Sequence, residues 1–246
     1  MYTDCDFSLE FILVVSIETF ITGELVEIAM VETVIFDLDN TLVVFDRDRN
    51  ARLAATTDEV GAPPLTNEEY LSVHKKYLTN ETREPIFAEL LADQDDIDPA
   101  AAAAAYRDVT AEAILPLDGV VAMLEELSHE YSIGLLTNGP ERAQREKLAT
   151  LGWDNLFDEA LATGEIQSGK PDSLSFKTIL NELAVSPEEA VYVGDSIESD
   201  INGATNAGLR AIQVLYDGGP DPHSRAAGHV EQNQIAEELP SLISTL

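Results

Sequence analysis

Three short stretches of the sequence place carboxylates and small polar residues directly after apolar runs. They are Asp37-Leu38-Asp39-Asn40-Thr41, Thr137-Asn138-Gly139 and Gly194-Asp195-Ser196. Side chains two positions apart on an extended chain lie on the same face, so Asp37 and Asp39 could converge on one point. Two carboxylates held together need a cation or a shared proton, because like charges at close range raise one pKa. With Asp195 and Asp200 they could form an all-oxygen site of the kind that Mg²⁺ prefers.

A single aspartate at a strand end is more often a helix cap or a turn residue than a ligand. Three polar strand ends in order, with Lys170 between the last two, are difficult to explain as caps alone. These residue types suit phosphoryl transfer, which needs mainly positioning and neutralisation of charge. Lys170 stands out because the chain has only 14 Lys and Arg against 46 Asp and Glu.

The elements that would position these residues alternate between strands and helices. Short β-branched and aromatic runs predict strands over 33–37, 132–137, 190–195 and 211–215. Helical patterns lie between them, over 118–130, from Pro140 to Gly152, and over 173–183 behind Asp172 as a cap. This alternation predicts a parallel sheet covered by helices, with ligands bound beyond the carboxyl ends of the strands.

Residues 43–116 interrupt the alternation and contain helical patterns only. The predicted helices cover 46–60, 67–79 behind a Thr66–Glu69 capping box, 84–92, and 99–115 behind Asp98. We therefore assign 43–116 to an inserted helical cap domain and 31–42 plus 117–246 to an α/β core domain. A loop over 216–229 and a terminal helix over 233–245 complete the core.

The order of these segments resembles the haloacid dehalogenase (HAD) superfamily, in its phosphatase-type branch with a helical cap. The resemblance rests on DLDNTL (37–42), LLTNG (135–139), GK-P (169–171) and VGDSIESD (193–200), and it extends over about 31–215. It implies a doubly wound, Rossmann-like parallel sheet with an inserted α-helical cap domain.

The resemblance also implies a role for each motif residue. Asp37 matches the nucleophile that forms an aspartyl-phosphate, and Asp39 matches the general acid and base. Lys170 matches the cation that neutralises the nucleophile and the phosphoryl oxygens. Thr137 and the Asn138 backbone match the group that holds the phosphate.

In the same pattern a Mg²⁺ ion is bound by the Asp37 carboxylate, the Asp39 backbone carbonyl and Asp195. Asp200 matches a second acid that is either a ligand or a support for one. The implied activity is Mg²⁺-dependent hydrolysis of a small phosphorylated metabolite, such as a sugar phosphate, phosphoglycolate or a nucleoside monophosphate. Three alternatives stay open: a 2-haloacid dehalogenase, against which Asp39 argues, a phosphomutase, and a non-catalytic binding module.

The formal net charge of −32 limits the partners of the protein. Nucleic acid and anionic membrane surfaces would be repelled, so neither is expected as a partner. Molar salt reduces the Debye length to about 3 Å and makes such self-repulsion tolerable. The one cysteine, Cys5, excludes an internal disulfide and a Cys-based zinc site. Together these features predict a cytoplasmic, salt-adapted (halophilic) protein.

The first thirty residues stand apart from the motifs. Their longest apolar run, Phe11–Ile17, is too short to span a membrane, and residues 1–30 contain no basic residue of the kind that begins a signal peptide. We interpret residues 1–30 as an N-terminal extension, and expect a chain beginning at Met30 to keep fold and activity. The alternative is an added strand or helix over 11–17 that packs on the core.

A basic cluster, Arg47, Arg49 and Arg52, follows the first motif directly. One of these arginines could face the cleft and bind an anionic group of the substrate. The sequence favours the simpler interpretation, in which they pair with Asp46, Asp48 and other local acids on a solvated helix.

Overall fold

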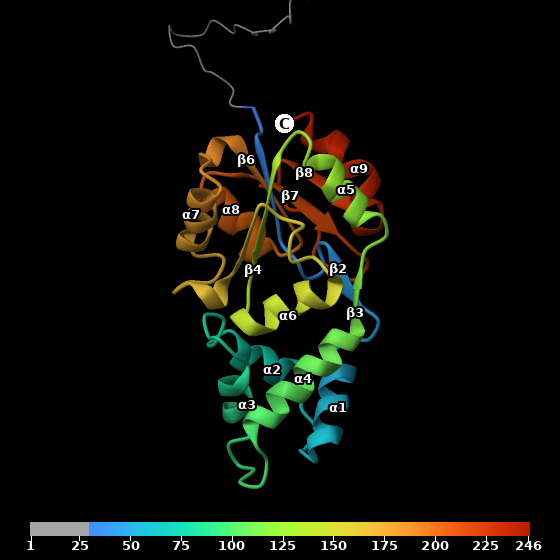
Figure 1. Cartoon of the computed structure of the whole chain (residues 1–246), viewed down its shortest axis with the longest axis vertical. Coiled ribbons are helices and arrows are strands. Elements are labelled where there is room, and N and C mark those ends of the chain that lie inside the picture. The colour runs from blue at the N-terminus through green and yellow to red at the C-terminus, as the bar shows by residue number, and fades with distance from the viewer. Residues whose placement is uncertain (1–29) are drawn as a thin grey trace, which may run out of the picture.

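A parallel sheet with strand order β5-β4-β1-β6-β7-β8 forms the centre of the structure, a computed structural model that describes residues 30–246 (Figure 1). Every neighbouring pair in this sheet is parallel. Its strands are β1 (Thr33–Phe36), β4 (Ser132–Thr137), β5 (Glu159–Ala162), β6 (Ala190–Gly194), β7 (Arg210–Leu215) and β8 (Gly228–Glu231).

The sheet is buried on both faces because side chains alternate along each strand. In β1, Val34 and Phe36 pack into one apolar cluster with α5 (Val120–Leu127), α6 (Glu141–Leu151) and α9 (Ile235–Ile243). Ile35 packs into the opposite cluster with α7 (Ser173–Glu182) and α8 (Gly203–Asn206). The predicted doubly wound α/β core is therefore confirmed.

Two strands of the sheet, β5 and β8, were not predicted. β5 has the sequence EALA and β8 has the sequence GHVE, so neither has the run of β-branched residues that marks a central strand. Both lie at the edges of the sheet, where pairing with β4 or β7 makes them strands. The predicted terminal helix is correspondingly shorter, because β8 and a 3₁₀ turn (Gln232–Gln234) precede it.

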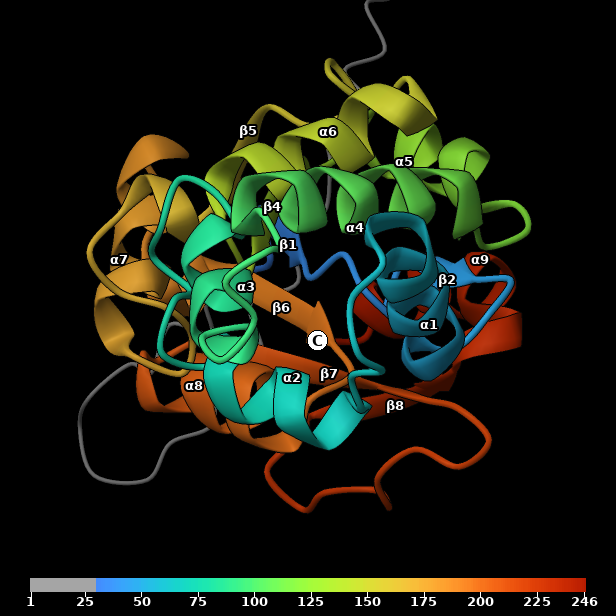
Figure 2. The same cartoon turned by 90° about the horizontal axis from the view of Figure 1, so that it is seen from below.

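A helical cap projects from the end of the core at which the site residues lie (Figures 1 and 2). Its helices pack around their own apolar cluster, which includes Leu53, Tyr70 and Tyr106. They are α1 (Arg49–Val60), α2 (Asn67–His74), α3 (Glu84–Leu90) and α4 (Pro99–Ala113). The capping box of Thr66 with Glu69 and the Asp98 cap are both present.

The expectation of helices alone in this insert is wrong. Two short strands, β2 (Val43–Phe45) and β3 (Ile114–Pro116), pair antiparallel and connect the cap to the core. α4 therefore ends at Ala113, two residues before the predicted end, because the residues that follow form β3 and pair with a segment about 70 positions away. No helix within residues 30–246 is long and apolar enough to cross a membrane. Our expectations for residues 1–29 concern residues outside those that the structure describes.

Candidate active site

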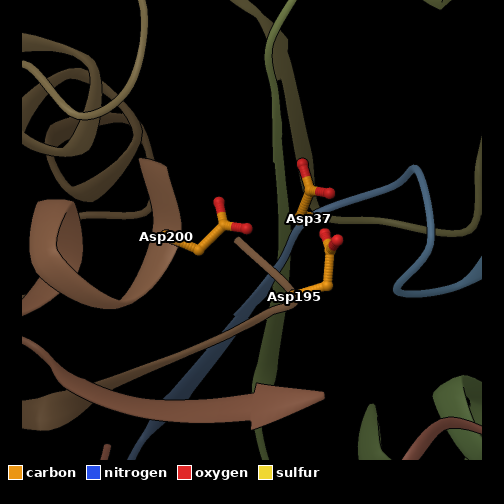
Figure 3. A group of neighbouring side chains, drawn as sticks. All are labelled: Asp37, Asp195 and Asp200. Atoms are coloured by element: carbon orange, nitrogen blue, oxygen red, sulfur yellow. The ribbon is translucent and has the colours of Figure 1, made fainter. Parts of the chain in front are cut away.

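Three buried carboxylates meet beyond the carboxyl ends of β1 and β6, which are neighbouring strands. Asp37 follows β1, Asp195 follows β6, and Asp200 lies in the π-helical turn Ile197–Asn202. Each offers one oxygen atom, and these atoms lie within 4.8 Å of one another (Figure 3). The three residues are 7%, 8% and 1% exposed. Such a group of buried acids needs protons or cations to offset its charge.

Lys170 supplies one of those cations. Its Nζ lies 2.6 Å from Asp37 Oδ1, 2.7 Å from Asp200 Oδ1 and 2.6 Å from the Tyr192 hydroxyl. Burial by itself would lower the pKa of Lys170, but the Asp200 and Asp37 carboxylates outweigh burial and raise the pKa above its ordinary value. Lys170 is therefore a permanent cation at the nucleophile position.

Lys170 alone does not neutralise the three acids. Burial, with a contribution from neighbouring carboxylates, raises the pKa of Asp37 to about 7 and that of Asp195 to about 8. The Asp195 carboxylate accepts a long contact of 3.5 Å from the Asn40 side-chain amide and also interacts with the Tyr216 hydroxyl. Two partly uncompensated carboxylates supply oxygen donors of the kind that suits a Mg²⁺ ion. The residues present therefore fit the metal that the motif pattern implied.

Asp200 has both of its oxygens occupied. Oδ1 accepts from Lys170, and Oδ2 accepts from the Ser196 backbone N–H at 2.9 Å. It also packs so closely against Gly194 that a Cβ there would come within 2.6 Å of the Asp200 Cγ. This arrangement favours a role in holding Lys170 and the Asp195 loop in place over direct coordination of a metal.

Asp39 does not join the three carboxylates. Its two oxygens accept hydrogen bonds from Lys147 Nζ at 2.7 and 2.5 Å. Although burial raises the pKa of Asp39, Lys147 outweighs burial and lowers it below the ordinary value. The convergence with Asp37 that strand periodicity suggested does not occur, because β1 ends at Phe36 and the chain turns there.

The second predicted strand end also lies at this edge of the sheet. The Asn138 side chain exchanges two hydrogen bonds with the Lys170 backbone, at 3.0 and 2.8 Å. The hydroxyl of Thr137, the last residue of β4, accepts from the Gln144 amide at 2.6 Å. The structure thus brings all seven predicted site residues to one end of the core. Gln144, Lys147 and Tyr192 were not singled out from the sequence.

A narrow pocket with a free volume of about 40 Å³, partly open to solvent, lies between this site and the cap. Asp39 and Lys147 line it from the core, and Arg49, Arg52, His74 and Arg83 line it from the cap. Of the basic cluster, only Arg47 shows the predicted pairing, with Asp46 at 2.9 Å. The solvated interpretation is wrong for Arg49 and Arg52, because α1 begins at Arg49 and places Arg52, one turn later, on its core-facing side.

The sequence profile of haloacid dehalogenase-like hydrolases matches residues 34–214. A glyceraldehyde 3-phosphate phosphatase of Methanopyrus kandleri is 33% identical over 75% of this chain and 84% of its own length. Human N-acylneuraminate-9-phosphatase is 37% identical over 52% of each chain. Among solved structures, a 2-haloacid dehalogenase from Pseudomonas syringae pv. Tomato superposes with a TM-score of 0.67 at 24% identity. That superposition covers 88% of this chain and 99% of the other, and at this identity it shows the fold alone.

Proposed function

The chain belongs to the haloacid dehalogenase-like hydrolase family, and from that premise we propose that it is a Mg²⁺-dependent phosphatase of a small phosphorylated metabolite. The observation that carries this proposal is the buried set of Asp37, Lys170 and Asp195 at the carboxyl ends of β1 and β6. An oxygen nucleophile beside a permanent cation and a metal-ligating acid is the arrangement that phosphoryl transfer requires.

In the proposed reaction, Asp37 attacks phosphorus and forms an aspartyl-phosphate, which water then hydrolyses. Lys170, held against Asp37 by Tyr192 and Asp200, favours the ionised form of the nucleophile against the effect of burial, and it would neutralise charge on the phosphoryl oxygens. A Mg²⁺ ion bound by Asp37, Asp195 and the Asp39 backbone carbonyl would supply further charge neutralisation. Thr137 and the Asn138 backbone would hold the phosphate.

Asp39 is the proposed acid for the leaving alkoxide and the base for the attacking water. Its contact with Lys147 favours the ionised form before substrate binds. The negative charge of a bound phosphate would raise the pKa of Asp39 and allow it to hold the proton that it transfers.

The relatives support phosphorus rather than carbon as the point of attack. The two described above are named as phosphatases of glyceraldehyde 3-phosphate and of an N-acylneuraminate 9-phosphate. The likeness to a dehalogenase structure concerns the fold, and Asp39 would have no role in a reaction at carbon. The motifs also fit a phosphomutase, which would have to exclude water from the aspartyl-phosphate.

Hydrolysis of p-nitrophenyl phosphate by the purified protein tests the proposal. We expect turnover that needs Mg²⁺, stops with EDTA and is abolished by Asp37→Asn, because no aspartyl-phosphate can then form. Arg47→Gln is the matched control, since Arg47 pairs with Asp46 away from the site. Metal-independent release of halide from 2-chloropropionate, without phosphatase activity, would show that the assignment is wrong.

A further inference from the structure

The cap side of the pocket holds a concentration of positive charge that the hydrolysis of a simple phosphate ester does not require. Four of the 14 basic residues of the chain line this pocket: Arg49, Arg52, Arg83 and Lys147. The carboxylate among the lining residues is that of Asp39, and burial and the neighbouring arginines lower the pKa of the lining His74 to about 3, so that it is neutral. Four cations and one carboxylate leave a net charge of +3 in a protein whose total charge is −32.

The three arginines have no carboxylate partner among residues 30–246, although acids outnumber bases by more than three to one. Four other arginines do form ion pairs: Arg47, Arg107, Arg142 and Arg145. Arg49 donates to the side-chain oxygen of Asn67 at 2.9 Å, a neutral acceptor. The guanidinium groups of Arg52 and Arg83 lie over the rings of Phe45 and Tyr106, at 3.8 and 5.3 Å from the ring centres.

Burial makes this lack of partners costly. Arg52 is 5% exposed and Arg83 is 9% exposed, and within residues 30–246 the Nε–H of each has no hydrogen-bond acceptor. The Arg83 guanidinium also interacts with the Tyr70 hydroxyl, which is a neutral partner. An aromatic face stabilises a guanidinium group but accepts no hydrogen bond along Nε–H. Buried and unpaired donors of charged groups normally cost a protein stability, so their presence in a pocket indicates a ligand that supplies the acceptors.

We propose that the substrate carries a second anionic group, a carboxylate or a second phosphate, which Arg52 and Arg83 bind in this pocket while its first phosphate reacts at Asp37. The planar fork of an arginine matches both anions in a bidentate manner. The inference rests on the proposed phosphatase function and narrows its substrate class. The pocket also includes Asp39 and Asn138, so it is continuous with the site of phosphoryl transfer.

Lys147 connects the two ends of such a substrate. It lies in the same pocket as the arginines, and it is 5% exposed with both of its short contacts on Asp39. An anion held by Arg52 and Arg83 would attract Lys147 and weaken its hold on Asp39. A substrate with the second anion would therefore gain in turnover as well as in binding.

The first experiment compares matched substrates with the wild-type protein. 3-Phosphoglycerate and glycerol 3-phosphate differ only in a carboxylate against a hydroxymethyl group. Propane-1,3-diol bisphosphate and its monophosphate provide the same comparison for a second phosphate. We expect kcat/KM to be higher by about tenfold or more for the member with the second anionic group in at least one pair, the effect of one charged hydrogen bond. The pair that shows the preference identifies the anion.

The second experiment removes the cations. Arg52→Gln and Arg83→Gln should reduce that preference by about tenfold each, whereas the control Arg47→Gln should keep it. Arg49→Gln, at a half-buried position, removes another cation that lines the same pocket and should reduce the preference to a smaller extent, so it keeps the test possible if circular dichroism shows that a buried variant fails to fold. Hydrolysis of p-nitrophenyl phosphate with no preference in either pair would overturn the anion site and leave the phosphatase assignment intact. Failure to hydrolyse any phosphate ester would instead refute the phosphatase assignment.

Discussion

The loss of activity on replacing Asp39 should depend on the leaving group of the substrate. Asp39→Asn keeps the backbone carbonyl proposed for the metal but removes the proton that an alkoxide leaving group needs. We expect turnover of alkyl phosphates to fall by about 10²–10⁴-fold, the usual contribution of a general acid. The loss with p-nitrophenyl phosphate should be smaller, because p-nitrophenolate leaves without a proton. Steady-state kinetics with both substrates measures the difference.

The variant also leaves the buried Lys147 without its carboxylate partner. A lower Tm is therefore expected, and the assays belong at a temperature at which both proteins are folded. Unchanged hydrolysis of alkyl phosphates by folded Asp39→Asn would contradict the proposed acid role.

Asp195 and Asp37 make the stability of the metal-free protein dependent on pH. Burial raises their folded pKa to about 8 and about 7, from an ordinary value of 3.8. At a pH between the ordinary and the raised pKa, each of the two carboxyl groups binds more protons in the folded protein than in the unfolded chain. The stability of the folded protein therefore falls as pH rises through 7 and 8. In EDTA, the Tm of the wild type should fall between pH 6.5 and 9.

Asp195→Asn is the comparison that isolates this effect, since the other titrating groups are common to both proteins. The variant should lose less Tm over the same pH range. Mg²⁺ should raise the Tm of the wild type at pH 9, because it binds the ionised carboxylates of the folded state, and should have little effect on the variant. If the Tm of the two proteins depended on pH in the same way in EDTA, the raised pKa of Asp195 would be refuted as the cause.

Among the elements, the contact between the cap and the core includes one close backbone approach, at Gly164. Gly164 lies in the turn Thr163–Glu165 after β5, facing the segment between α2 and α3. A Cβ there would come within 2.0 Å of the Glu141 nitrogen and 2.6 Å of the Asn80 carbonyl oxygen. The same atoms form the hydrogen bond from Glu141 N–H to Asn80 O at 3.1 Å, which joins the cap to the start of α6.

Gly164→Ala should therefore displace the start of α6 and disrupt its hydrogen bond with the cap. A displacement of about 1 Å at a reaction site can cost about 10²-fold in rate, so we expect kcat/KM to fall by one to two orders of magnitude. Gly61→Ala is the control, because Gly61 ends α1 with open space around it, so that the change costs only about 1 kcal/mol of backbone strain. Equal activity of the two variants would show that this contact does not control closure.

The charge of the whole molecule, −32, sets how the protein responds to salt. Repulsion among so many acids opposes the compact state, and ions screen it over a Debye length that falls from about 10 Å at 0.1 M to about 3 Å at 1 M. We expect the Tm, measured in EDTA so that no metal contributes, to rise as KCl increases over this range. A Tm that is flat or falls would contradict salt adaptation, which stays a prediction together with a cytoplasmic location.

Most of the core and the location of its site could be predicted from the sequence alone. The short β-branched and aromatic runs identified four strands to within a residue at each end, because buried central strands need apolar side chains on both faces. Asp37 and Asp195 directly follow two of those strands and Thr137 ends a third, so parallel pairing alone brings them to one edge. The edge strands β5 and β8 and the β2–β3 ribbon exist through pairing with distant segments, and their own residues do not indicate strands.

The surroundings of those site residues depend on tertiary contacts and could not be predicted from the sequence. Lys147 is 108 positions from Asp39 in the sequence, yet it contacts both oxygens of that carboxylate and lowers its pKa. Arg52 was expected in solvent beside local acids, but the cap folds it against the core, where no carboxylate among residues 30–246 forms an ion pair with it. Helical periodicity shows which side of a helix an arginine occupies, but which surface that side meets depends on the packing of the cap on the core. Charge compensation in the site therefore follows from contacts between segments far apart in the chain.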